Sequence, residues 1–115
     1  MIRSLLASLP RNLATIAALG LTAAPVAAQT SEAWSAEKCR LYGDAWEAAK
    51  EMQGMVGLGD AFLARHDAFL ASDCTRAHDV CPVSPQERQM ADLLTVMSMS
   101  EGMASTFVPF ACPGR

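Results

Sequence analysis

The sequence predicts an all-α fold, a small three-helix bundle held together by two disulfides and preceded by an N-terminal signal peptide. Three observations predict it. Three segments repeat apolar residues with the period of a helix, about 3.6 residues, and no segment alternates as a strand does. Four cysteines occur in only 115 residues. The first residues have the composition of an export signal.

Residues 1–28 form the predicted signal peptide. Arginines flank an otherwise uncharged start, and the apolar run of residues 13–24 is shorter than the about 20 residues that a membrane-spanning helix needs. Val26 and Ala28 place small residues at the two positions that signal peptidase inspects. We therefore expect cleavage after Ala28 and a periplasmic or secreted protein. A retained membrane anchor is the alternative.

Residues 29–115 are the predicted helical, disulfide-bonded domain, and 87 residues are enough for one domain. All twelve acidic residues but only seven of the nine basic residues lie in it, which gives a formal charge of −5. An acidic domain argues against binding to nucleic acid or to an anionic membrane surface, because both attract basic surfaces.

The first helix is predicted from Ala36 to Gln53, with Ser35 as its N-cap and Gly54 as its stop. The second is predicted from an N-cap at Asp60 to about Ala77. Its apolar side includes His66, and its small residues are expected to let another helix approach closely; these are Ala61, Ala64, Ala68 and Ala71.

The third helix has the strongest local signal, because Ser84 to Glu87 reads as a capping box with Pro85 at the first helical position. It is predicted to end near Ala104 and to have two apolar faces. The first consists of Met90, Leu93, Leu94, Met97 and Ala104, and the second of Val96, Met99 and Met103. We expect the C-terminal tail, with Phe107, Val108 and Phe110, to cover the second face. The alternative is a partner protein, which would make Val96, Met99 and Met103 an interaction patch.

Cys39, Cys74, Cys81 and Cys112 are predicted to form two disulfides that each contribute about 2–4 kcal/mol. Cys74 and Cys81 are close in sequence, so joining them costs little chain entropy. That pairing leaves Cys39 for Cys112, which the tail can reach by running back along the bundle. We therefore predict Cys74–Cys81 and Cys39–Cys112, with Cys39–Cys74 and Cys81–Cys112 as the alternative.

Motifs of catalysis are missing from the sequence, including a nucleophile elbow, a phosphate loop and a haem attachment motif. We therefore expect no enzyme and no cofactor, and we assign no catalytic or metal-binding residue; His66 is interpreted as a packed core histidine. A metal-handling protein is the rival class. Zinc would use Cys74, His78 and Cys81, and copper would use methionines of the third helix. Met97 and Met99 point about 200° apart on a helix, which argues against one copper ion.

Cys81–Pro82, the amphipathic helix after it and the run from Pro109 to Cys112 resemble the second half of periplasmic immunity proteins of the Tai type, which neutralise effectors delivered by type VI secretion. The likeness covers about a third of the chain. The first half departs from the family, which carries a cysteine followed closely by Gly, Tyr and Ile. The resemblance implies a helical, disulfide-bonded inhibitor of a secreted effector.

The function expected from these observations is that of a small exported protein, a non-catalytic module that binds another periplasmic or envelope protein. Metal handling and inhibition of a secreted effector are the alternatives. We expect no nucleic-acid partner, and no contact with the membrane after signal cleavage.

Overall fold

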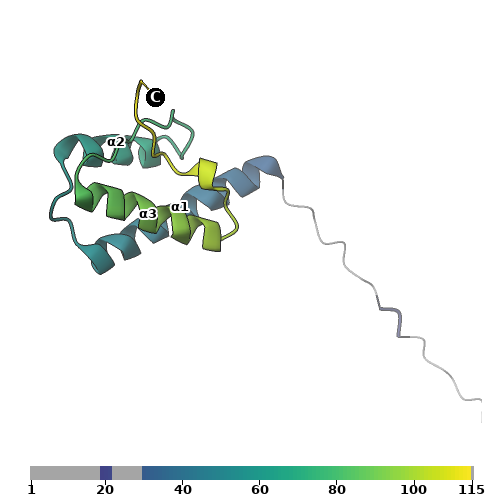
Figure 1. Ribbon diagram of the computed structural model, residues 1–115. Helices are drawn as coiled ribbons and strands as arrows, with labels where there is room; N and C mark the ends of the chain where they lie inside the picture. Colours follow the sequence, from purple (N-terminus) through teal and green to yellow (C-terminus); the bar gives the residue numbers. More distant parts are fainter. Residues whose placement is uncertain (1–18, 22–29, 115) are drawn as a thin grey trace, which may run out of the picture.

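The computed structural model describes residues 19–21 and 30–114, and residues 30–114 form an all-α domain (Figure 1). The helices are α1 (Ser31–Gln53), α2 (Asp60–Ala71), α3 (Pro85–Ser100) and the short 3-10 helix η1 (Ser105–Phe107). The predicted three-helix fold with two disulfides is therefore confirmed. Apart from residues 19–21, the predicted signal peptide lies outside the described residues. Among the helices described, none has the length and apolar character needed to cross a membrane.

Helix α1 begins five residues earlier than predicted. Thr30 is the N-cap, and its Oγ1 accepts a hydrogen bond from the N–H of Ala33 at 3.0 Å. Ser35, the predicted cap, lies inside the helix and donates from Oγ to the carbonyl of Ser31 at 2.9 Å. Two hydroxyl residues were suitable caps, and the polar segment between them continues the helix. The end at Gln53 is as predicted, because Gly54 adopts a left-handed conformation with φ 80°.

Helix α2 ends six residues earlier than predicted, at Ala71 and not at Ala77. Asp73 and Cys74 both take positive φ, 56° and 58°, which ends the helix. Ser72 stabilises the turn, since its Oγ donates to Phe69 and accepts from the N–H of Arg76. Asp60 is the first helical residue, and the N-cap is Gly59, so the helix also starts one position from the predicted cap.

Helix α3 has the predicted capping box. Ser84 Oγ accepts from the N–H of Glu87 at 3.0 Å, and Glu87 Oε1 accepts from the N–H of Ser84 at 3.1 Å. The buried Glu87 carboxylate also accepts from the N–H groups of Gly59 and Val83. Desolvation by burial would raise the pKa of Glu87, but these backbone hydrogen bonds outweigh it and hold the pKa below its ordinary value. Glu87 therefore joins the loops before α2 and α3.

The other end of α3 differs from the prediction, because the helix stops at Ser100 and not at Ala104. Gly102 turns the chain with φ 84°, and the N–H of Met103 donates to the carbonyl of Ser98 at 3.0 Å. This turn, typical of helix C-termini, directs Met103 inward. Met103 is consequently only 4% exposed and belongs to the core.

The helices pack around one core, with α1 and α3 antiparallel and α2 on one side of them (Figure 1). The Gln53 side-chain amide donates to the backbone carbonyl of Gln86 at 2.7 Å, which places the end of α1 beside the start of α3. Small residues of α1 and α3 are buried at their contact. The largest apolar core residues are Tyr42, Trp46, Phe62, Phe69, Met90 and Leu94.

The disulfides are Cys39–Cys74 and Cys81–Cys112, so the predicted pairing is wrong. The short loop between Cys74 and Cys81 favoured a local bridge, but that loop carries Cys81 away from the end of α2. Val80 forms a parallel bridge with Phe110, with the Val80 N–H donating to Pro109 at 3.0 Å. This pairing sets Cys81 beside Cys112. Cys39 instead faces the end of α2, where Cys74 lies.

The C-terminal tail packs back on the bundle, but not on the predicted face. The Phe107 ring meets the rings of Tyr42 and Phe69 edge-on at 6.0 and 6.1 Å between centroids. Phe110 stacks on Phe62 at 6.1 Å. The Val80 bridge and the Cys81–Cys112 disulfide draw the tail to α2, and Val96 and Met99 of α3 stay 62% and 55% exposed. The tail therefore completes the core and leaves those two side chains uncovered.

Candidate functional site

A groove follows the seam between α1 and α3, on the side away from α2. It consists of two depressions placed end to end, which together we call the α1–α3 groove. The first holds about 470 Å³ and is lined by Met52, Gln53, Gln89, Asp92, Leu93 and Val96. The second holds about 240 Å³ and is lined by Leu41, Asp44, Ala45, Ala48, Met97 and Glu101.

The helix period explains why the groove runs along this seam. On α1, the lining residues recur every three or four positions and therefore form one stripe; they are Leu41, Ala45, Ala48 and Met52. Alanines in the middle of the stripe leave a low floor, and longer side chains form the walls. Met52 is 70% exposed and Val96 is 62% exposed. Apolar side chains thus line a concave surface that no other segment of residues 30–114 fills.

The polar residues of the groove are mostly acidic. Asp44, Asp92 and Glu101 line it, and no lysine or arginine is among the described residues that line either half. Asp44 is paired with Arg40 at 3.0 Å, whereas Asp92 and Glu101 form no ion pair with the described residues. The pKa of Arg40 is raised, first by its hydrogen bond to Glu37 and less by the charges of Asp44 and Glu101. The positive charge of Arg40 is therefore already shared between the carboxylates of Glu37 and Asp44.

The structure divides the predicted interaction patch. Val96 lies in the α1–α3 groove, and Met99 is exposed one turn further along α3. Met103 does not belong to the patch, because the turn at Gly102 buries it. The sequence analysis did not identify the α1 half of the groove, for which Ala45 and Ala48 were the available signal.

His66 is packed in the core, as interpreted from the sequence. Its Nε2 lies 2.7 Å from the hydroxyl of Tyr42, and its ring centroid is 4.2 Å from that of Trp46. Nδ1 is buried without a hydrogen-bond partner among the described residues. Burial, and to a lesser extent the charge of Lys50, lowers the pKa of His66 to about 4. Burial also raises the pKa of Tyr42, so both side chains are neutral at pH 7.

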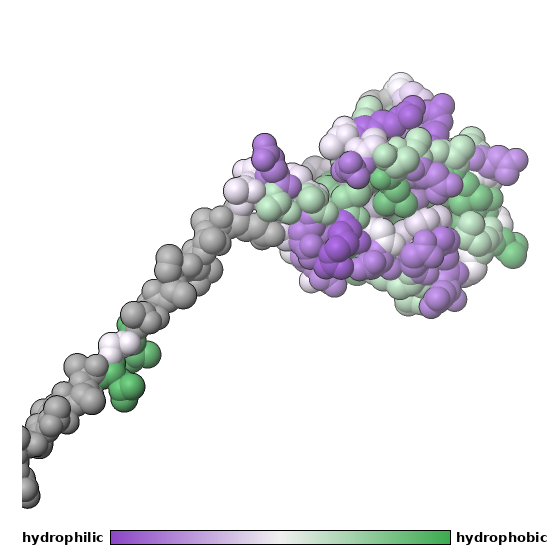
Figure 2. Space-filling model, turned by 180° about the vertical axis from the view of Figure 1, so that it is seen from behind, coloured by the Kyte–Doolittle hydropathy of each residue, from purple (hydrophilic) through white to green (hydrophobic). Residues whose placement is uncertain are grey.

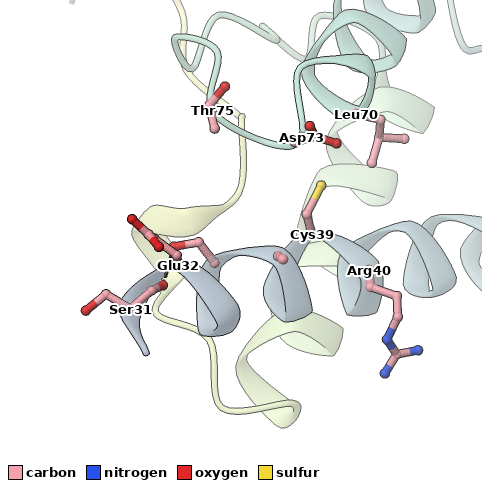
Figure 3. A pocket seen from close by; sticks show the side chains of 9 residues that line it. Ser31, Glu32, Cys39, Arg40, Leu70, Asp73 and Thr75 are labelled. Atoms are coloured by element: carbon pink, nitrogen blue, oxygen red, sulfur yellow. Dashed lines mark hydrogen bonds between the residues drawn. The ribbon is translucent and has the colours of Figure 1, made fainter. Parts of the chain in front are cut away.

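A second concavity lies where α1 begins and α2 ends (Figure 3). It holds about 740 Å³ and is lined by Ser31, Glu32, Ser35, Ala36, Cys39, Arg40, Leu70, Asp73 and Thr75. Figure 3 shows Asp73 and Thr75 on the loop that faces the first turns of α1. Its charged residues are of both signs, Glu32, Arg40 and Asp73.

The residues considered for metals are not arranged as a metal site. Cys74 and Cys81 both belong to disulfides, so they offer no thiolate to zinc. Met99 is exposed and Met103 is buried beyond the end of α3, so they do not face one ion. Within the described part of the chain, no three His, Cys, Asp or Glu side chains are grouped as metal ligands.

The face of the domain seen in Figure 2 carries both hydrophobic and hydrophilic residues. Figure 2 shows its hydrophobic residues in separate areas divided by hydrophilic ones. Comparison of the chain with protein-family models, with curated proteins and with solved structures finds no match.

Proposed function

We propose that this protein is a periplasmic, non-catalytic domain that binds another protein through the α1–α3 groove. One observation carries the proposal: Val96 and Met52 remain exposed in a concave apolar surface, although a long apolar tail is available and packs elsewhere. Exposed apolar surface costs free energy in water, and such surfaces are frequent where proteins bind partners.

The cysteines support the proposed compartment. All four are paired in disulfides, which form and persist in oxidising compartments outside the cytoplasm. The predicted signal peptide would deliver the chain there. The proposal of a periplasmic domain rests on these two features together. An inhibitor of a secreted effector, which the sequence resemblance implies, would be one form of such a binding protein.

Affinity capture with matched variants tests the proposal. The tagged, disulfide-bonded protein is incubated with envelope extract as the wild type and as Val96→Asp and Val83→Asp. Val83 is 67% exposed, close to the value for Val96, but lies in the link before α3 and outside the groove. We expect the wild type and Val83→Asp to recover the same protein and Val96→Asp to lose it. Recovery that does not depend on Val96, or no recovery at all, would refute the proposal.

A further inference from the structure

We propose that the partner places an amphipathic α-helix with a basic polar side in the α1–α3 groove. This inference rests on the proposed function and goes beyond it, because it specifies the secondary structure and the charge of the bound segment. Three features of the groove support this proposal: its shape, its negative charge, and the repulsion between like charges that would arise if two copies of this chain met there.

The shape of the groove suits a helix. Leu41 and Met52 are eleven positions apart on α1, about 17 Å along its axis, which corresponds to about three turns of a bound helix. Ala45 and Ala48 permit a close approach of its backbone, as small residues do between packed helices. An extended peptide usually binds by adding a strand to a sheet edge, and residues 30–114 contain no sheet. A helix in the seam would continue the packing of α1 against α3.

The apolar side chains of the groove predict the sequence of the bound helix. Met52 of α1 and Leu93 of α3 line the first depression, and Leu41 of α1 and Met97 of α3 line the second. A helix lying between such walls inserts apolar residues at spacings of three, four and seven positions. Methionines in the walls can adapt their shape to the inserted side chains.

The charge of the groove predicts the polar side of the same helix. Asp92 of α3 lies in the first depression, and Glu101, the residue that caps the end of α3, lies in the second; nine positions separate them, or about 14 Å along the helix axis. Both carboxylates lack an ion-pair partner among the described residues. Lysine or arginine residues near both ends of the bound helix would complement them, and the overall charge of the domain would speed association with a basic partner.

A second copy of this chain fits the groove less well. Two copies that met through this face would bring Asp92 and Glu101 of one near acidic residues of the other, and like charges in a contact are unfavourable. We therefore assign the groove to a different protein of opposite charge.

Three synthetic peptides of about 18 residues test the inference. They share one leucine and alanine stripe with helical spacing, and their polar positions are all lysine, all glutamine or all glutamate. Their Kd values for the oxidised protein are measured by fluorescence anisotropy at low and high salt. We expect the lysine peptide to bind about tenfold more tightly than the glutamine peptide, the glutamate peptide to bind weakest, and high salt to reduce the difference.

Matched variants place the binding in the groove. Asp92→Asn should raise the Kd of the lysine peptide about three- to tenfold and leave the Kd of the glutamine peptide unchanged. Asp67→Asn, on the exposed surface of α2, should change neither. The inference is refuted if the lysine peptide does not bind, if charge makes no difference, or if Asp67→Asn weakens binding as much as Asp92→Asn. A dimer in sedimentation that Val96→Asp abolishes would also refute it.

The two proposals fail separately in these experiments. If the lysine peptide does not bind but capture from extract still depends on Val96, the partner has another chemistry and the proposed function stands. If the peptide binds in the groove but capture does not depend on Val96, the groove accepts a basic helix and is not the site that this protein uses for its partner.

Discussion

The two sides of α1 have similar apolar residues but different surroundings. The side towards α2, with Cys39, Tyr42 and Trp46, is closed by a disulfide, by His66 and by Phe107 of the tail. The side along the α1–α3 groove, with Ala48 and Met52, has no such cover from the segments that the structure describes. The difference therefore comes from distant segments that pack on one side only. Apolar character on a helix identifies a side that can be buried, and the rest of the chain determines whether it is.

The largest effect should come from the disulfide that holds the tail on the closed side. Replacing Cys81 and Cys112 together with serine should lower the free energy of unfolding by about 2–5 kcal/mol, because the tail regains its freedom in the unfolded chain and loses its anchor in the folded one. Chemical denaturation measures the change. Peptide mapping without reduction should show Cys39 linked to Cys74 in both proteins, and a Cys74–Cys81 peptide would contradict this account of the fold.

The buried histidine on the closed side should make stability depend on pH. The pKa of His66 is about 4 in the folded protein and about 6.5 in the unfolded chain, so only the unfolded chain takes up the proton between these values. The contribution of His66 to the free energy of unfolding should therefore be fully present above pH 6.5. It should decrease by about 3 kcal/mol as the pH falls to 4. Denaturation at several pH values checks this. His66→Gln, which retains a partner for Tyr42, should remove this part of the pH dependence; a curve identical to that of the wild type would contradict it.

Glu87 joins the loops before α2 and α3, and its replacement should lower the free energy of unfolding by less than the two changes above. Glu87→Gln keeps the size of the side chain but removes the negative charge of the carboxylate. The oxygens of that carboxylate accept hydrogen bonds from the backbone N–H groups of Gly59, Val83 and Ser84. We expect a loss of about 1–3 kcal/mol, as is usual for hydrogen bonds to a buried charged group. Thermal unfolding at pH 7 gives the value, with Glu47→Gln on the exposed surface as the control. Equal effects of the two substitutions would show that the Glu87 network is unimportant.

The groove side should tolerate substitution with the smallest change in stability. Val96→Ser removes an exposed methyl-bearing side chain, so the free energy of unfolding should change by less than about 0.5 kcal/mol. Denaturation of this variant measures the change. A loss above about 1.5 kcal/mol would mean that Val96 supports the fold and that the two sides of α1 are less different than the structure indicates.

Local signals in the sequence predicted several features of the fold correctly. The capping box at Ser84 fixed the start of α3, and Gly54 fixed the end of α1, because such signals depend only on neighbouring residues. The helix ends at Ala71 and Ser100 were missed. Each depends on a turn that directs the chain towards a distant contact, the Cys39–Cys74 disulfide in one case and the burial of Met103 in the other.

Long-range features were the hardest to predict, and the groove depends on them. The disulfide pairing follows from the bridge between Val80 and Phe110, which pairs two segments without a repeating pattern. The small residues of α2 were expected to admit a neighbouring helix, yet Ala61 and Ala64 are exposed, and α1 and α3 supply the alanines at the close contact. Val96 and Met99 were predicted to lie on a second apolar face covered by the tail, but both stay exposed, and the extent of the groove along α1 depends on how α1 and α3 pack together.

The most direct test of the groove as the binding surface is site-specific photocrosslinking in the living cell. A photoreactive phenylalanine analogue is incorporated at position 96 or, as the control of similar exposure, at position 83. We predict that irradiation joins the protein to one partner from position 96 and not from position 83. Crosslinks from position 83 alone, or equally from both positions, would contradict the conclusion that the α1–α3 groove is where this protein binds.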